Sequence, residues 1–420
     1  MKNEVLTLLE AGSNVFLTGG AGVGKTTITL DVIKHFESEA KKVAKLASTA
    51  MAATLVGGQT LHSFFDFGIS GSLDELEKNG KLEPKKKTKK LVASIDLIVI
   101  DEISMVSDNT LEMIAFRLKQ CDFKGNILAV GDFLQLPPVV KGYNSVGFAF
   151  EAPSWQELAF EIIELTHVYR TDDKAFIELL QQIRYGYVDE NVHNQLNHYI
   201  KPLPHDFSQY TFLFGKNVSA SHHNKKQLEL IEGDLYTKEA QIVKHKESVN
   251  DKEIERFFDD ARIEKELELK INAPVLFTRN AWNYYNGERG VIVNIDTQYL
   301  YVQKSDGRVV KLEAVAQSKS HWVEKTVNGT KEMVEENSFS IYQYPVKLAF
   351  AITIHKSQGM SIESLIIDTK EIFAPSQFYV ALSRSSNPLH LILIAPNTQW
   401  YNLAFVDKRA LRFVQEGSLC

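Results

Sequence analysis

Short apolar runs alternate with helical patterns along the first third of the chain. Continuous apolar runs of this kind are typical of strands that a parallel sheet buries on both faces. Strands are expected at 15–17, 42–47, 97–100 and 127–130, and helices from 25 onward and at 109–119. Strands that alternate with helices predict a doubly wound α/β sheet, whose functional residues lie at the carboxyl ends of the strands.

A second α/β unit is predicted in the other half of the chain. Its expected elements are helices at 174–184, 219–231 and 377–383, and strands at 211–214, 365–368 and 390–394. Each strand is again a short apolar run, so a second buried parallel sheet is expected.

The middle of this second unit has a different pattern. A charged amphipathic or surface helix is expected at 252–270, and short strands are expected beyond Pro274. The turn dipeptides Asn286-Gly287 and Asp306-Gly307 separate these strands, as in hairpins. We therefore expect an inserted small β barrel or meander, with strands at 275–277, 291–295, 299–303 and 309–312.

Residues 66–92 interrupt the first unit. The segment is rich in Gly, Ser, Lys and Glu and shows weak periodicity, so we expect it to lie outside the main core. It contains the densest basic run of the chain, at 85–90. Such a run is typically a solvated loop, and contact with nucleic-acid phosphates is the alternative that stays open.

The sequence from Gly19 to Thr26 carries the clearest chemistry. It fits G-x-x-x-x-G-K-[ST] and lies between a predicted strand and a predicted helix. In such a loop, backbone N–H groups surround the phosphates of a nucleotide, the lysine reaches the β and γ oxygens, and the hydroxyl of Thr26 holds Mg²⁺. The competing interpretation is a glycine turn with a solvated lysine, which the flanking strand and helix disfavour.

Acidic and amide side chains follow two later strands. Asp101 and Glu102 end the third predicted strand, where Asp101 can bind Mg²⁺ and Glu102 can deprotonate a water molecule that attacks the γ-phosphate. Gln135 follows the fourth strand, where it can reach the same nucleotide. The alternative is a surface acidic pair that caps the helix beginning near Asn109.

Length and charge narrow the class of protein. The 420 residues suffice for roughly two or three domains, and no apolar run reaches the length of a membrane span. The net charge of −6 argues against a protein that coats nucleic acid through overall charge, although a local basic groove remains open. Cys121 and Cys420 allow neither a disulfide framework nor a cysteine zinc site. We expect a cytoplasmic enzyme with no membrane partner.

Four further blocks, in this order, resemble the motifs of Pif-type and RecD-like superfamily 1 DNA helicases. They are DEISMV at 101–106, GDFLQLPPV at 131–139, LAFAITIHKSQGMS at 348–361 and QFYVALSR at 377–384. The resemblance implies an α/β fold of two RecA-like phosphate-loop domains, 1–167 and 168–420, that clamp ATP between them. It also implies a strand-separating wedge insertion at 66–92 and an SH3-like β insertion at 273–339.

The resemblance assigns roles residue by residue. The implied catalytic residues are Lys25, Glu102, Gln135, Arg170 and Arg384. Among these, Gln135 would sense the γ-phosphate, Arg384 would be the arginine finger, and Arg170 would be a second arginine that faces the phosphates. Thr26 and Asp101 would bind Mg²⁺. The implied ATP-binding residues are Gly20, Ala21, Gly22, Val23, Gly24, Lys25, Thr26 and Thr27. For either arginine alone, a surface ion pair is the alternative.

The resemblance also implies that single-stranded DNA crosses the top of both domains. The implied DNA-binding residues are Thr49, His62, Ser63, Phe64, Thr353, His355, Lys356 and Ser357. Hydroxyls, a lysine and an aromatic ring suit a sequence-tolerant grip through phosphate hydrogen bonds and base stacking. For Phe64, core packing is the alternative.

The function implied is an ATP- and Mg²⁺-dependent DNA helicase that moves 5′-to-3′ on single-stranded DNA and acts at junctions with duplex. A monomer is expected, and replication or recombination proteins are candidate partners. Two alternatives stay open: a DNA-stimulated translocase or recombination subunit that needs a partner, and a phosphate-loop NTPase switch without nucleic acid. No Gln precedes Gly19, which leaves base selectivity open, and Ala50, Thr171 and Ser376 also depart from the family pattern.

Overall fold

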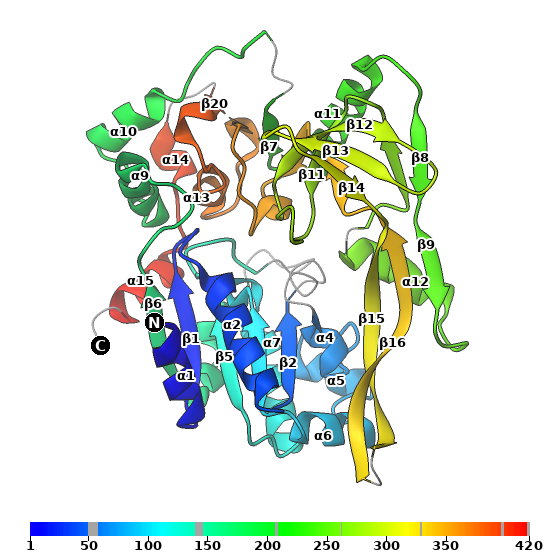
Figure 1. Cartoon of the computed structure of the whole chain (residues 1–420). Helices are drawn as coiled ribbons and strands as arrows, with labels where there is room; N and C mark the ends of the chain where they lie inside the picture. Colours follow the sequence, from blue (N-terminus) through cyan, green and yellow to red (C-terminus); the bar gives the residue numbers. More distant parts are fainter. Residues whose placement is uncertain are drawn as a thin grey trace.

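Two parallel sheets and an antiparallel β region make up the molecule (Figure 1). The structure is a computed structural model that describes residues 1–48, 58–138, 146–205, 209–261, 263–327, 330–395 and 399–417. The first sheet and its helices lie at the bottom of the view, with the second sheet and the antiparallel region above it. Among the described residues, no helix has the length and apolar character needed to cross a bilayer.

The first sheet has six strands, all parallel, in the order β3-β2-β4-β5-β1-β6. Alternate residues of β1 pack on opposite faces: Val15 and Leu17 lie in one apolar cluster and Phe16 lies in another. Burial on both faces explains the continuous apolar runs, and the mixed α/β fold with a parallel sheet is confirmed. The strands are β1 (Asn14–Gly19), β2 (Val43–Ala47), β3 (Gln59–Thr60), β4 (Leu97–Asp101), β5 (Asn126–Val130) and β6 (Phe160–Leu165).

Helices cover both faces of this sheet. On one face, α1 (Lys2–Glu10) and α2 (Lys25–Ser38) pack against Val15 and Leu17. The other face carries α4 (Leu61–Phe64), α5 (Leu73–Lys78), α6 (Lys86–Ala93), α7 (Asp108–Gln120) and α8 (Pro153–Leu158). The last helix, α15 (Lys408–Gly417), joins this second face, although it follows the second sheet in sequence.

The segment 66–92 was expected to lie outside the main core, and that expectation is wrong. Phe67, Leu76 and Leu91 are buried in the same cluster as Phe16. The basic run is also a helix, α6, rather than a loop. The few apolar residues of this segment point inward once per helical turn, so a composition dominated by lysine and glutamate hides its amphipathic character.

The second sheet has four parallel strands in the order β18-β7-β19-β20. Its strands are β7 (Thr211–Phe214), β18 (Ala351–Thr353), β19 (Leu365–Asp368) and β20 (Leu391–Ile394). The helices beside it are α9 (Lys174–Arg184), α10 (Glu190–Asn197), α11 (Asn217–Leu230), α13 (Gln377–Leu382) and α14 (Trp400–Leu403). Single-turn 3-10 helices are η1 (Ile103–Met105), η2 (Ala149–Glu151), η3 (His355–Ser357), η4 (Thr369–Glu371) and η5 (Pro388–His390).

A five-stranded antiparallel sheet interrupts the second unit, in the order β14-β13-β12-β11-β17. The four strands predicted beyond Pro274 are all present. The strands are β11 (Pro274–Phe277), β12 (Arg289–Ile295), β13 (Leu300–Lys304), β14 (Val309–Leu312) and β17 (Val346–Leu348).

The helix predicted at 252–270 is only partly correct. The observed α12 (Asp251–Ala261) ends early, and β10 (Glu266–Leu269) pairs with β8 (Tyr236–Glu239). In β10, Leu267 and Leu269 are buried while Glu266 and Glu268 are exposed, which is the period of a strand rather than a helix.

A long hairpin was not predicted at all. Its strands β15 (Val315–Val327) and β16 (Thr330–Gln343) pair along their length, with β9 (Gln241–Lys244) beside β16. The hairpin runs down the right side of Figure 1 to α6 of the first unit. There the Nζ of Lys90 lies 2.8 Å from Oε1 of Glu324.

Candidate active site

Glycines shape the loop between β1 and α2. Gly19, Gly22 and Gly24 have positive φ angles of 134°, 78° and 87°. A Cβ on Gly19 would lie 2.3 Å from the carbonyl oxygen of Leu165, and a Cβ on Gly22 would lie 2.7 Å from Cβ of Arg170. No larger residue fits these two positions, because backbone or neighbouring side chain fills the space.

Lys25 begins α2 and turns back into the loop. Its ammonium group donates hydrogen bonds of 2.8 Å to the carbonyl oxygens of Gly19 and Gly20. Burial lowers the pKa of Lys25, while Asp132 and Glu102 raise it. The ammonium group therefore lies where phosphate oxygens can accept its hydrogen bonds in place of the two carbonyl oxygens. The interpretation as a glycine turn with a solvated lysine is wrong.

The acidic pair lies at the end of β4. The backbone N–H of Glu102 donates to Oδ1 of Asp101 at 2.9 Å, and Glu102 has a positive φ of 52°. Burial raises the pKa of Asp101 to about 7 and also raises that of Glu102. A bound cation would stabilise the ionised form of both carboxylates and so oppose the effect of burial on their pKa values. The pair does not cap the following helix, because the Ser107 hydroxyl accepts from the N–H of Thr110 there.

A buried ion pair that the sequence did not reveal supports this acidic corner. Arg184 donates to both carboxylate oxygens of Asp132, at 3.1 and 3.0 Å. Arg184 lowers the pKa of Asp132 against the effect of burial, and Asp132 in turn raises the pKa of Arg184. Nε2 of Gln135 donates to the same carboxylate at 3.2 Å, so Asp132 orients the amide that was predicted to sense phosphate.

Two further arginines enter from the other side. Arg170 donates to the hydroxyl of Ser361 at 2.9 Å and to the carbonyl of Ser383 at 2.6 Å. Arg384 donates to the carbonyls of Val380 and Ser357 and to the hydroxyl of Ser383. Burial lowers the pKa of Arg170 to about 9 and that of Arg384 to about 10. Neither is a surface ion pair in this structure.

Tyr379 connects the phosphate loop to the second sheet's helices. The N–H of Ala21 donates to the Tyr379 hydroxyl at 2.8 Å, although these residues are 358 positions apart. Burial raises the pKa of Tyr379 to about 12, so the phenol stays neutral. Since α13 carries Tyr379 and ends just before Arg384, this hydrogen bond joins the phosphate loop to the helix that leads to the arginine.

A cavity of about 310 Å³ brings the predicted groups together. Its lining includes all the predicted catalytic and Mg²⁺-binding residues, namely Lys25, Thr26, Asp101, Glu102, Gln135, Arg170 and Arg384. Of the predicted ATP-binding residues, Gly20 and Thr27 lie outside this lining. Tyr169, which the sequence did not indicate, lines the cavity and has 72% of its side chain exposed. A cluster of an acidic pair, a lysine and three polar or cationic groups can bind and cleave a phosphoanhydride.

The predicted DNA-binding residues of the first unit differ in how exposed they are. Thr49 lies outside the described residues. His62 is half-buried, and its Nε2 lies 3.1 Å from the carbonyl oxygen of Ser70. Ser63 is exposed. Phe64 is only 3% exposed and packs in the core against Phe65, so its predicted stacking on DNA does not fit its position. Phe64 belongs to the apolar cluster that covers one face of the first sheet.

The residues predicted in the second unit lie around η3. Thr353 ends β18, and its hydroxyl accepts from the N–H of Lys356 at 3.3 Å. His355 and Lys356 are half-buried. Ser357 is fully buried and its carbonyl accepts from Arg384, so this segment connects directly to the nucleotide cleft.

Comparisons with known proteins agree with this geometry. A family model described as PIF1-like helicase matches residues 3–194. The ATP-dependent DNA helicase Pif1 of Campylobacter jejuni is 39% identical over 98% of this chain and 97% of its own length. The crystal structure of Bacteroides sp Pif1 in complex with ADP-AlF4 has a TM-score of 0.84 at 27% identity, and covers 100% of this chain and 96% of that chain. Bacteroides Pif1 with ADP-AlF3 and ssDNA covers the same shares at 28% identity, with a lower TM-score of 0.66.

Proposed function

This chain belongs to the PIF1-like helicase family and is an ATP-dependent DNA helicase, and we propose that it moves 5′-to-3′ along single-stranded DNA. The observation that carries the proposed mechanism is the cavity in which Lys25, Glu102 and Arg384 meet. Lys25 and the loop N–H groups bind the phosphates of ATP. Glu102 takes a proton from the attacking water, and Gln135, oriented by Asp132, contacts the γ-phosphate.

Thr26 and Asp101 are the residues that would hold Mg²⁺, and both line the cavity. The raised pKa of buried Asp101 fits a position that a cation completes. When bound, Mg²⁺ neutralises charge on the β and γ oxygens of ATP.

Arg170 and Arg384 would couple hydrolysis to motion. Both are held by residues of the second unit, Ser361 and Ser383 among them, while the phosphate loop belongs to the first sheet. Cations that reach across a cleft stabilise transition-state charge only when the cleft closes. Each ATP cycle would thus close and open the cleft and alternate the grip on DNA between the segments near His62 and His355.

Tyr169 suits the base of the nucleotide. Its ring lies beside Gly24, about 3.6 Å from where a Cβ would stand, and it is largely exposed. We propose that the base stacks on this ring. Stacking needs only a π face, so it tolerates different bases, in line with the absence of a glutamine before Gly19.

The remaining expectations extend this proposal. We propose the domain boundaries at 167/168, the wedge role of 66–92 and the SH3-like nature of the β insertion at 273–339. The related Bacteroides structure with ssDNA supports single-stranded DNA as the partner. Action at duplex junctions, a monomeric state, replication or recombination partners and a cytoplasmic location also stay predictions.

The test is steady-state ATPase activity with and without a single-stranded oligonucleotide, at low and moderate salt. Strong stimulation that weakens with salt is expected, because salt weakens phosphate contacts. Lys25→Ala should abolish hydrolysis, and a fully active variant would contradict the site. A duplex with a 5′ single-stranded tail should be unwound by the chain alone, and one with a 3′ tail should not. Unwinding only with an added partner protein would favour the translocase alternative.

A further inference from the structure

A second cavity adjoins the cavity of the candidate active site. It has a volume of about 850 Å³, and its lining comes from the β11–β12 loop, the β13–β14 turn and the segments after η3 and α13. Tyr169, Arg170 and Ser361 line both cavities, whereas Lys25 and Glu102 belong to the lining of the first alone. The phosphates of ATP are therefore expected in the first cavity, and the rest of the nucleotide can extend past Tyr169 into this adjoining cavity.

The β insertion packs directly on the wall that the two cavities share. Arg170 donates to the hydroxyl of Ser361 at 2.9 Å. In the β11–β12 loop, a Cβ on Gly287 would lie 2.8 Å from Cβ of Met360 and 3.0 Å from the carbonyl oxygen of Ser361. Gly287 also has a positive φ of 86°, so only glycine allows this close approach. The insertion thus lies against the segment that holds Arg170.

Two exposed tyrosine rings line the adjoining cavity. Tyr285 is 56% exposed and belongs to the β11–β12 loop. The N–H of Tyr169 donates to the carbonyl of Gly22 in the phosphate loop at 2.8 Å, and the N–H of Tyr285 donates to Oε2 of Glu288 at 3.2 Å. The backbone of each ring is therefore anchored. Exposed aromatic faces of this kind are typical contacts of a nucleic-acid base.

The two carboxylates of the adjoining cavity differ in their partners. Oε1 of Glu288 lies 2.8 Å from Nζ of Lys304, and both side chains are nearly buried. Glu363 is exposed, and within the part of the chain that the structure describes its carboxylate accepts no hydrogen bond and forms no ion pair. Burial raises the pKa of Tyr285, and Glu288 and Glu363 raise it further, so the Glu363 carboxylate lies within electrostatic reach of that phenol. An available carboxylate suits a ribose, whose hydroxyls donate to such acceptors.

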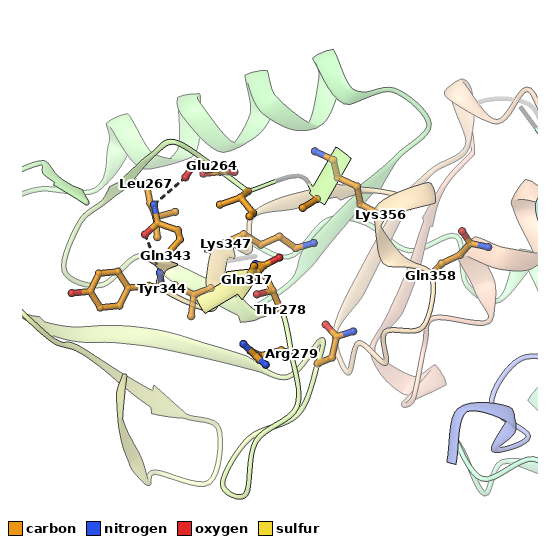
Figure 2. A pocket seen from close by; sticks show the side chains of 14 residues that line it. Glu264, Leu267, Thr278, Arg279, Gln317, Gln343, Tyr344, Lys347, Lys356 and Gln358 are labelled. Atoms are coloured by element: carbon orange, nitrogen blue, oxygen red, sulfur yellow. Dashed lines mark hydrogen bonds between the residues drawn. The ribbon is translucent and has the colours of Figure 1, made fainter. Parts of the chain in front are cut away.

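The antiparallel region contains another, smaller cavity, of about 90 Å³ (Figure 2). Its lining includes Arg279, Asn286 and Gln317. None of its described lining residues also lines the candidate active site or the adjoining cavity. Of these two cavities of the antiparallel region, the adjoining cavity is therefore the one that borders the phosphate site.

We propose that the adjoining cavity receives the nucleoside half of ATP, with the ribose hydroxyls donating to Glu363 and the ring of Tyr285 contacting the base from the side of the antiparallel sheet. This inference rests on the proposed stacking of the base on Tyr169 and extends it. The β insertion then contributes to the affinity for ATP, together with the two parallel sheets.

Initial rates of DNA-stimulated hydrolysis of ATP and of 2′,3′-dideoxyATP, which lacks both ribose hydroxyls, test the carboxylate. Glu363→Ala should raise the KM for ATP about tenfold with kcat unchanged, because one hydrogen bond to a charged group is lost from ground state and transition state alike. Glu363→Gln should cause a smaller rise, since its amide oxygen still accepts. With dideoxyATP, both variants should have the KM of the wild-type protein. Equal rises with both nucleotides would contradict the contact between Glu363 and the ribose.

The aromatic contact is tested separately. Tyr285→Ala should raise the KM about fivefold for both nucleotides, the low end of the range for one aromatic contact with a base. Tyr285→Phe should restore the wild-type KM, because the ring and not the hydroxyl makes the contact. Inorganic tripolyphosphate, which has no nucleoside, should inhibit Tyr285→Ala, Glu363→Ala and the wild-type protein with the same inhibition constant. An inhibition constant that rises with KM would place the effect at the phosphates and overturn the proposal.

Matched controls are Tyr401→Ala, which removes another exposed ring, and Glu229→Ala, which removes another exposed carboxylate of the second unit. Both should keep the wild-type KM for ATP. A rise in either control equal to that in Tyr285→Ala or Glu363→Ala would show that the effect is not specific to the adjoining cavity, and would contradict the proposal.

The outcomes separate this inference from the proposed function. If Glu363→Ala and Tyr285→Ala keep the wild-type KM while Tyr169→Ala raises it, the adjoining cavity does not hold the nucleoside, and the stacking on Tyr169 stands. If Tyr169→Ala also keeps the wild-type KM, the proposed position of the base fails as well. Loss of hydrolysis in Lys25→Ala would still support the phosphate site, and a wild-type protein without DNA-stimulated ATPase activity would contradict the proposed function itself.

Discussion

Two groups of arginine lie at or beside the cavity of the candidate active site, and their charges are balanced in opposite ways. Arg184 forms an ion pair with the buried carboxylate of Asp132, and its pKa is raised. The side chains of Arg170 and Arg384 donate five described hydrogen bonds, all to hydroxyl or carbonyl oxygens, and burial lowers the pKa of both arginines. The first group is electrostatically complete, and the second is not.

The difference indicates different tasks. A buried charge is costly unless a counter-charge accompanies it. Arg184 has that counter-charge within the fold, so the pair fixes α9 against the end of β5. Arg384 also lowers the pKa of Arg170 by repulsion, so these two cations store an unfavourable arrangement that a phosphate group would relieve. We therefore propose that Arg170 and Arg384 act on the substrate, and that the paired Arg184 acts on the structure.

The largest expected effect comes from removing Arg384, the proposed arginine finger. Arg384→Ala should lower kcat for DNA-stimulated ATP hydrolysis by about 10³- to 10⁵-fold, because an arginine finger stabilises transition-state charge. Its thermal midpoint should fall less than that of Arg184→Met, since the lost contacts are hydrogen bonds to hydroxyl and carbonyl oxygens and no ion pair between described residues is broken. A kcat within tenfold of wild type would contradict the assignment of Arg384.

The opposite result is expected at the paired arginine. Arg184→Met should lower the free energy of unfolding by about 3–5 kcal/mol, because the buried carboxylate of Asp132 loses its counter-charge. Adding Asp132→Asn to the same protein should recover part of this loss by removing the orphaned charge. Thermal and urea unfolding of the wild-type protein and the two variants measure the effect. Equal stability of Arg184→Met and wild type would remove the distinction between the two groups.

The resemblance to helicase motifs indicated Arg170 and Arg384, but nothing in the sequence indicated the Asp132–Arg184 pair. Lys25, Asp101 and Glu102 were found because each follows a short apolar strand in a local pattern. The Asp132–Arg184 pair joins residues 52 positions apart, and neither lies in a spacing that indicates the other. Only the parallel sheet and the packing of α9 bring them together. Contacts that depend on tertiary structure leave no local signal.

In the antiparallel β region, too, the sequence predicted the elements with local signals and missed those without them. Strands separated by Asn-Gly and Asp-Gly turns were predicted correctly, since such dipeptides are local hairpin signals. The long hairpin β15–β16 has many charged and polar residues on both strands, and β9 and α6 lie beside it. The exposure of Tyr285 was equally hidden, because composition does not separate a buried tyrosine from an exposed one.

A moderate effect is expected at the base of the nucleotide. Tyr169→Ala should raise the KM for ATP by about 5- to 100-fold, the range of one stacking contact, with a smaller change in kcat. Tyr169→Phe should restore most of the affinity, because the ring and not the hydroxyl stacks. Initial rates over a range of ATP and GTP concentrations give both constants. An unchanged KM in Tyr169→Ala would show that the base binds elsewhere.

The smallest expected effect tests the hydrogen bond that joins the phosphate loop to α13, the helix before Arg384. The Tyr379 hydroxyl accepts from the N–H of Ala21, and α13 then leads directly to Arg384. Tyr379→Phe removes one neutral hydrogen bond, worth about 0.5–1.5 kcal/mol, and should lower kcat by about two- to tenfold. The control is Tyr401→Phe, whose ring is 62% exposed and distant from the loop in sequence. If the Tyr379 bond only stabilised the fold, the thermal midpoint would fall and kcat would not. A lower kcat at an unchanged midpoint would mean that the Tyr379 bond helps to hold Arg384 at the phosphate loop when the cleft is closed.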